Sequence, residues 1–134
     1  MRIMLDTNIL ISAIISRNDF MPSIFKHIRD NHTIVLSQHT IFELCKTINN
    51  KFSKSILHMR QFMRSFDYEL VVINHIDKSK HHLIRDINDL PILIAAIEAK
   101  VDILITGDSD FHAVVIDTPR ILTARQYHDE FIVS

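Results

Sequence analysis

Carboxylates follow two of the apolar runs in this sequence, at positions where they could share one site. The run RIML ends in Asp6, and the run DILIT is followed, after Gly107, by Asp108 and Asp110. A charged residue directly after four apolar strand positions is costly to bury without a partner, so Asp6 is hard to explain structurally. Because sites in open parallel sheets lie at the carboxyl ends of the strands, we expect these acids to meet there.

Two further acids, Glu43 and Asp89, stand near the starts of predicted helices and would complete a set of five. Five carboxylates in one pocket cannot all stay ionised without compensation. Oxygen ligands without a cysteine or histidine motif favour Mg²⁺ or Mn²⁺, which can activate water and neutralise the charge of a phosphodiester. The expected metal ligands, and thus the expected catalytic residues, are Asp6, Glu43, Asp89, Asp108 and Asp110.

Several of these acids also have a structural interpretation. Glu43 completes a capping-box pattern, TIFE, although a cap at Ser37 would move Glu43 to the second turn of the helix. Asp89 could simply cap the helix that follows it. Asp108 or Asp110 could shape the turn after the strand.

Gly107 is the only glycine of the chain. Glycine is favoured where the backbone adopts positive φ or where another group approaches closely. We expect Gly107 to turn the chain sharply off its strand, so that Asp108 and Asp110 face the same metal as Asp6. A side chain at this position would crowd the metal or the bound phosphate.

The formal net charge is −1, but the charges are unevenly distributed. Residues 45–85 contain eight basic and three acidic residues, and without the five candidate ligands the whole chain has 15 basic and 11 acidic residues. A solvated helical face explains such a run equally well. A basic chain around an acidic, metal-filled pocket nevertheless suits a polyanionic substrate. The RNA-binding candidates are Lys46, Lys51, Lys54, Arg60 and Arg64.

Other features of the composition narrow the class of protein. The single cysteine, Cys45, excludes an internal disulfide, fits a reducing, cytoplasmic location and is expected to be a small core residue on a helix. No run approaches the ~18 apolar residues of a membrane span, so no membrane association is expected. With one glycine, P-loop, dinucleotide-binding and GxSxG motifs are excluded.

The carboxylates need a scaffold, which the apolar runs predict. Strands are expected at residues 2–6, 33–37, 68–74, 102–106 and, as a short fifth, at AVVID, residues 113–117. Helices are expected at residues 9–16, 22–30, 38–50, 53–66, 90–99 and 123–131, with a polar helix or loop at 78–85. Strands separated by helices predict one α/β domain over residues 1–134, a parallel sheet between two helical layers.

Four segments of the chain resemble the PIN-domain nucleases, metal-dependent ribonucleases that include toxins of VapBC-type toxin–antitoxin pairs. The segments are MLDTNILISA, LSQHTIFEL, RDINDLPILIAA and DILITGDSDF, in family order and over almost the whole chain. The resemblance implies a five-stranded parallel sheet in the order 3-2-1-4-5 and a divalent-metal site built from the five acids named above. Asn8 and Thr106 match positions that support this site. The segment RDIND offers both Asp86 and Asp89 for the third acid, and Asp89 is preferred because it begins the helix.

The function implied by the resemblance is hydrolysis of RNA phosphodiester bonds by a Mg²⁺- or Mn²⁺-dependent endoribonuclease. Such a protein is either the toxin of a type II toxin–antitoxin pair, with an antitoxin as partner, or a stand-alone PIN protein; a homodimer is expected. One alternative is a regulated or inactive PIN-like binding module. A less favoured alternative is an aspartate-dependent phosphatase or receiver-type domain, because the phosphatase would need an aspartate where Asn8 stands.

Overall fold

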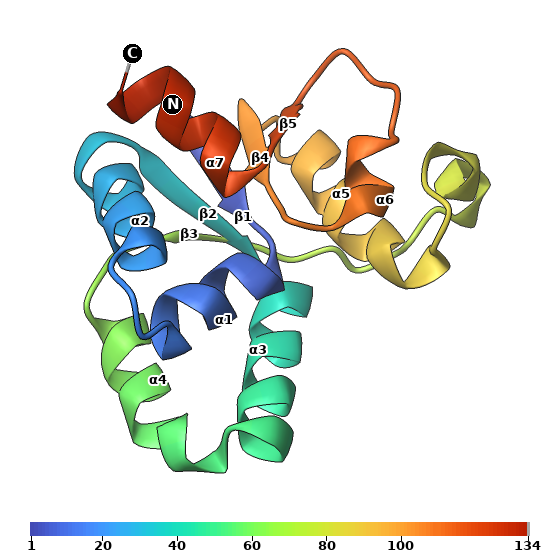
Figure 1. Cartoon of the computed structure of the whole chain (residues 1–134). Coiled ribbons are helices and arrows are strands. Elements are labelled where there is room, and N and C mark those ends of the chain that lie inside the picture. Colours follow the sequence, from blue (N-terminus) through green and yellow to red (C-terminus); the bar gives the residue numbers. More distant parts are fainter. Residues whose placement is uncertain (134) are drawn as a thin grey trace.

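Five parallel strands form the central sheet of the protein, in the order β3-β2-β1-β4-β5 (Figure 1). The structure is a computed structural model, described here for residues 1–133. The strands are β1 (Arg2–Leu5), β2 (Thr33–Ser37), β3 (Glu69–Val71), β4 (Ile103–Ile105) and β5 (Arg120–Leu122). Both the α/β class and the strand order predicted from the sequence are confirmed. The order also differs from the 2-1-3-4-5 sheet of receiver domains.

Helices connect the strands. They are α1 (Thr7–Ile15), α2 (Phe20–Asn31), α3 (Gln38–Lys51), α4 (Ile56–Arg64), α5 (Leu90–Glu98), α6 (Ser109–His112) and α7 (Ala124–Tyr127). Short 3-10 turns are η1 (Ser53–Ser55), η2 (Lys78–Leu83) and η3 (Ile87–Asp89), and a π-helical turn, η4 (His128–Ile132), extends α7. Within residues 1–133, no helix has the length and apolar character needed to cross a membrane.

The alternation of side chains along the strands builds two cores. In β1, Ile3 and Leu5 face a core that α1, α2, α3, α4 and α7 cover, while Met4 faces a second core under α5 and α6. The sheet is therefore sandwiched between two helical layers (Figure 1). Since buried strands leave no polar face, this explains why the three inner strands, β1, β2 and β4, are almost continuously apolar.

The prediction of a fifth strand at AVVID is wrong, because β5 lies at Arg120–Leu122. Two parallel strands start on the same side of the sheet, so the chain must return across the sheet after β4 before β5 can begin. The intervening helix, α6, has only four residues, so residues 113–119 are used for the return. Val114 and Ile116 pack against the second core on the way, whereas Val115 is 90% exposed.

Cys45 is exposed, contrary to the prediction of a small core residue. The buried side of α3 is formed by Thr40, Leu44 and Ile48, which recur every four residues. Cys45 is one position off this stripe and is turned away from the core as a result.

Candidate metal centre

The ends of β1 and β4 are joined by a buried hydrogen-bonded pair. Asp6 follows β1, is 5% exposed and caps α1, its Oδ1 accepting the N–H of Thr7 at 2.7 Å. Its Oδ2 accepts the hydroxyl of Thr106, which follows β4, at 2.7 Å. Burial raises the pKa of Asp6, its hydrogen bonds oppose this, and the nearby carboxylates of Glu43 and Asp108 raise it further.

Glu43 approaches the same place from α3. Ser37 caps this helix by accepting the N–H of Thr40 at 3.0 Å, so Glu43 lies in the second turn and does not take part in a capping box. Its Oε1 accepts the hydroxyl of Thr7 at 3.2 Å and pairs with Nε2 of His39 at 3.1 Å. The hydrogen bond from His39 lowers the pKa of Glu43 and raises that of the histidine.

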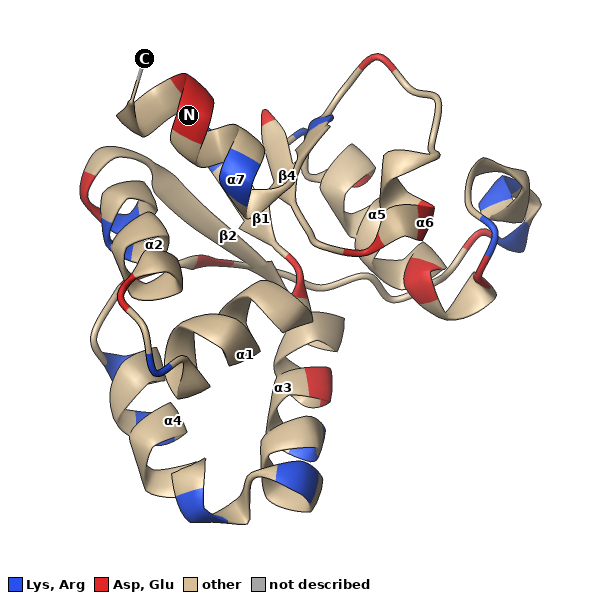
Figure 2. Ribbon diagram, in the orientation of Figure 1, with Lys and Arg blue, Asp and Glu red and all other residues tan. Residues whose placement is uncertain are grey.

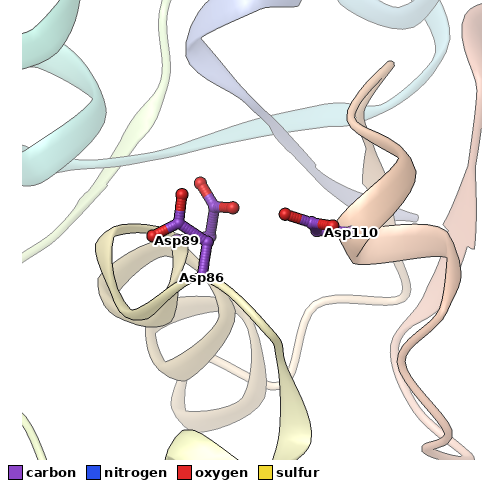
Figure 3. A group of neighbouring side chains, drawn as sticks. All are labelled: Asp86, Asp89 and Asp110. Atoms are coloured by element: carbon purple, nitrogen blue, oxygen red, sulfur yellow. The ribbon is translucent and has the colours of Figure 1, made fainter.

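Asp86 and Asp89 lie on the same side of the turn that precedes α5. Residues three apart eclipse one another in a 3-10 helix, and η3 runs from Ile87 to Asp89. One oxygen from each of Asp86, Asp89 and Asp110 lies within 4.8 Å of the others. In Figure 3 the Asp110 carboxylate, carried by α6, points across towards the other two. Both aspartates of RDIND therefore reach the cluster.

Asp89 lies where a cation would be needed most. Its Oδ2 is buried and, among the described residues, has no hydrogen-bond partner. Although Asp89 occupies the N-cap position of α5, its side chain makes no capping hydrogen bond, which argues against a purely structural role. Burial, followed by the charges of Asp108, Asp86 and Asp6, raises the pKa of Asp89 to about 7.

Asp108 and Asp110 complete the group from the turn after β4. Asp108 caps α6, with its Oδ1 accepting the N–H of Asp110 at 2.9 Å, so it shapes the turn as well as facing the site. Both oxygens of Asp110 are paired with the guanidinium of Arg85, Oδ1 to Nε at 2.9 Å and Oδ2 to Nη2 at 3.0 Å.

The expected backbone role of Gly107 is not observed. Gly107 does not have positive φ, and a Cβ built on it meets no protein atom within 4 Å. The turn is instead stabilised by the hydroxyl of Thr106, which accepts the N–H of Asp108 at 3.1 Å. The open space beside Gly107 leaves the second expectation, that a side chain would obstruct a ligand, as a prediction.

The five acids expected from the sequence lie around the carboxyl edge of the sheet, but within residues 1–133 the carboxylate oxygens that gather within 4.8 Å of one another belong to Asp86, Asp89 and Asp110, not to Asp6, Glu43 or Asp108. The charges of Glu43 and Asp108 act on Asp6, and those of Asp108 and Asp6 act on Asp89. Asp110 belongs to the same group through its proximity to Asp89. An all-oxygen donor set with one buried, unpaired oxygen fits a hard divalent cation.

Four further residues of the site were not selected from the sequence as site residues. These are Thr7, His39, Arg85 and Asp86. The spacing of His39 and Glu43, four residues apart on one helix, is a readable signal for an ion pair. Asp86 had been considered only as an alternative to Asp89. Asn8, a predicted supporting residue, is exposed in the first turn of α1.

The PIN-domain family model matches residues 2–110. The chain belongs to the PIN-domain family. A solved structure with a similar fold is the crystal structure of VapBC2 from Rickettsia felis bound to a DNA fragment from their promoter. The two chains superpose with a TM-score of 0.68 at 24% identity, over 91% of this chain and 97% of the other. No curated protein matches the sequence.

Two groups of basic residues stand out in this PIN domain, one on α3, η1 and α4 and one on η2, although further basic residues lie elsewhere in the chain (Figure 2). The first group contains the five RNA-binding candidates. Lys46, Arg60 and Arg64 line a cavity of about 710 Å³ between α3 and α4, whose other walls are mostly apolar. None of the candidate metal ligands lines this cavity, so it lies apart from the acidic cluster.

Proposed function

We propose that this PIN domain is a Mg²⁺- or Mn²⁺-dependent endoribonuclease that hydrolyses RNA phosphodiester bonds. The observation that carries the proposal is the buried, unpaired Oδ2 of Asp89, which lies among carboxylates from separate parts of the chain. A polar atom in this position costs free energy unless a ligand satisfies it. The carboxylates gathered around it favour a cation over an anion or an apolar group as that ligand.

Asp6, Glu43, Asp89 and Asp108 would hold the cation, with Asp110 completing the site. When bound, a Mg²⁺ or Mn²⁺ ion supplies an activated water and neutralises charge on the scissile phosphate. The chain's own contribution is to fix the ligands. The hydrogen bond of Thr106 holds the Asp6 carboxylate between the two central strands.

The remaining contacts fix Glu43 and the approach of the substrate. Thr7 and His39 both contact Oε1 of Glu43 and thereby restrict the carboxylate on an otherwise solvent-facing turn. The five basic candidates on α3, η1 and α4 would attract the RNA backbone, which is the dominant, salt-dependent part of nucleic-acid affinity.

The proposal is tested by incubating a labelled RNA of mixed sequence with the purified protein in Mn²⁺, Mg²⁺ or EDTA. Asp6→Asn and Asp89→Asn remove a proposed ligand charge, and the second removes no hydrogen bond at its buried oxygen. Asp19→Asn is the matched control because Asp19 is exposed at the start of α2 and makes no side-chain cap. We expect metal-dependent cleavage by the wild type and the control, and none by the two site variants.

Cleavage that survives EDTA, or that both site variants retain, would refute the proposal. A folded wild-type protein that binds Mn²⁺ but leaves RNA intact under all conditions would favour the alternative of an inactive, PIN-like binding module. Mn²⁺ binding is followed separately, from the electron paramagnetic resonance signal of the free ion.

We further propose that the protein is the toxin of a type II pair and binds an antitoxin. The similarity in fold to VapBC2 supports this, as does the cavity between α3 and α4. Apolar walls of Ile56, Met59 and Met63 with basic residues at the rim would suit an amphipathic helix that carries acidic residues. The expected antitoxin is the product of a small neighbouring gene, and adding it to the cleavage assay should abolish activity. Undiminished cleavage at a saturating concentration of the partner would count against this assignment.

The homodimer stays a prediction, which light scattering of the purified protein would test.

A further inference from the structure

Arg85 forms an unusual ion pair at the edge of the acidic cluster. Its guanidinium holds both oxygens of Asp110, at 2.9 and 3.0 Å, while 83% of the arginine side chain is exposed and only 15% of the aspartate side chain is. Asp110 is one of the expected metal ligands, so a cation that engages it competes directly with Arg85. Because the guanidinium side of the pair is open to solvent, Arg85 can leave Asp110 for another anion without itself being buried.

We propose that Arg85 binds an RNA phosphate beside the scissile bond, releasing Asp110 when the metal engages that carboxylate. The inference rests on the proposed nuclease function and assigns a second phosphate subsite to it. The planar fork of a guanidinium fits a phosphate as well as a carboxylate, and binds either through two parallel hydrogen bonds. Arg85 can therefore exchange one anion for the other with the same two N–H groups.

A hollow of about 520 Å³ lies at this position. It is lined by His81, His82, Leu83, Ile84, Arg85, Asp110 and Ala113. Asp110 belongs both to this hollow and to the acidic cluster, so the hollow adjoins the proposed metal centre. A phosphodiester chain running out of the metal centre past Asp110 would enter it directly.

The backbone on which Arg85 stands is fixed although its side chain is exposed. Nε2 of His81 donates to the carbonyl of Arg85 at 3.2 Å, and Nδ1 of His82 donates to the carbonyl of Ser79 at 2.8 Å. The neighbouring Ile84 is 4% exposed and packs in the second core. The two imidazoles thus use an N–H each to hold the loop that carries the guanidinium.

The surrounding charges explain why an anionic strand would need this arginine. Asp86 and Asp108 lie close enough to act on Arg85 electrostatically and would repel a phosphate. Lys78 and Lys80 belong to η2, and Figure 2 shows basic segments there close to acidic ones near α5 and α6. The RNA would therefore pass from the metal centre onto η2, in addition to the basic surface of α3 and α4.

The test uses Arg85→Gln, Arg85→Lys and, as a matched control, Arg17→Gln. Arg17 is an exposed arginine in the α1–α2 connection, outside both groups of basic residues. Binding of a fluorescein-labelled RNA is measured by anisotropy in Ca²⁺ over a range of salt, and binding of Mn²⁺ alone by electron paramagnetic resonance. For Arg85→Gln we expect affinity for RNA to fall about 5- to 10-fold and the salt slope to decrease by about 1. Its affinity for Mn²⁺ should rise a few-fold because Asp110 is released, and Arg85→Lys should restore part of the RNA affinity.

An Arg85→Gln protein whose RNA affinity and salt slope equal those of Arg17→Gln would overturn the inference, even if the wild type cleaves RNA. Faster cleavage at unchanged RNA affinity would also overturn it, since Arg85 would then only block Asp110. Weaker Mn²⁺ binding would do the same by making Arg85 a positioning residue for the aspartate. Conversely, an Arg85-specific loss of RNA binding in a protein that cleaves no RNA would support the subsite while refuting the nuclease.

Discussion

Removing the charge of Asp89 should stabilise the protein when no divalent cation is present. Asp89 has a pKa of about 7 in the folded chain, against the ordinary value of 3.8, because burial and three neighbouring carboxylates oppose its ionisation. The folded state therefore holds the proton more tightly than the unfolded state does. Stability falls as the pH rises from about 4 to about 7, and the full penalty is present above that range.

The magnitude follows from the displacement of the pKa. A rise of the pKa from 3.8 to about 7 means that ionising Asp89 costs about 4 kcal/mol more in the folded chain than in the unfolded chain. Because the carboxyl group is only partly buried and water screens the neighbouring charges, we expect about 1–2 kcal/mol of this in the free energy of unfolding. For a domain of 134 residues, that corresponds to a change of about 3–8 °C in Tm.

The assay is thermal unfolding in EDTA at pH 5 and pH 8 for the wild type, Asp89→Asn and the control Asp19→Asn. We expect Asp89→Asn to exceed the wild type only slightly at pH 5, where Asp89 is ionised in the unfolded chain but still protonated in the folded one, and by several degrees at pH 8, where the full penalty is present. Adding Mn²⁺ at pH 8 should raise the Tm of the wild type far more than that of the variant. If Asp89→Asn is no more stable than the wild type at pH 8, or if its advantage is the same at both pH values, the electrostatic reasoning fails.

Three other perturbations test separate contacts of the site. His39→Gln should lower the free energy of unfolding by about 0.5–1 kcal/mol at pH 5.5 and by almost nothing at pH 9, as measured by urea unfolding at the two pH values. The reason is that the ion pair with Glu43 is lost as the pH rises through the raised pKa of His39. Thr106→Val should cost about 1–3 kcal/mol in urea unfolding and weaken Mn²⁺ binding, because it leaves Oδ2 of the buried Asp6 without its hydroxyl donor. Gly107→Val should keep the wild-type Tm, given the open space beside the glycine, but cripple RNA cleavage by obstructing the substrate; full cleavage with unchanged Mn²⁺ affinity would contradict this.

Much of the fold was predictable because each buried strand is a continuous apolar run, and because helices between the runs require parallel pairing. The ends of β1 and β4 carry Asp6 and Asp108 to neighbouring positions on one edge, so their convergence follows from topology alone. The fifth strand was misplaced because AVVID is as apolar as a strand. Hydrophobicity does not tell a strand from a return loop that packs on the core.

The finer parts of the site depend on geometry that single-residue patterns do not carry. In the sequence, Asp86 and Asp89 are alternatives for one position because both belong to RDIND, whereas in the structure a 3-10 turn puts both on one side. The pair of Arg85 and Asp110 joins residues 25 apart across two connections whose path is set only by packing of the second core. No local sequence pattern predicts such a contact.

The distribution of partners within the acidic cluster argues for where a cation would gain most. At one end Glu43 is already paired with His39, and at the other Asp110 is paired with Arg85. The charge of Asp108 acts on Asp89, whose Oδ2 has no hydrogen-bond partner among the described residues. A cation bound at Glu43 or Asp110 would first have to displace the basic side chain that is paired with it. A cation bound at Asp89 instead relieves the repulsion between carboxylates directly. The pairs made by His39 and Arg85 therefore make Asp89 the preferred position for a cation. Both basic side chains become available to an anionic substrate once Glu43 and Asp110 turn towards a metal.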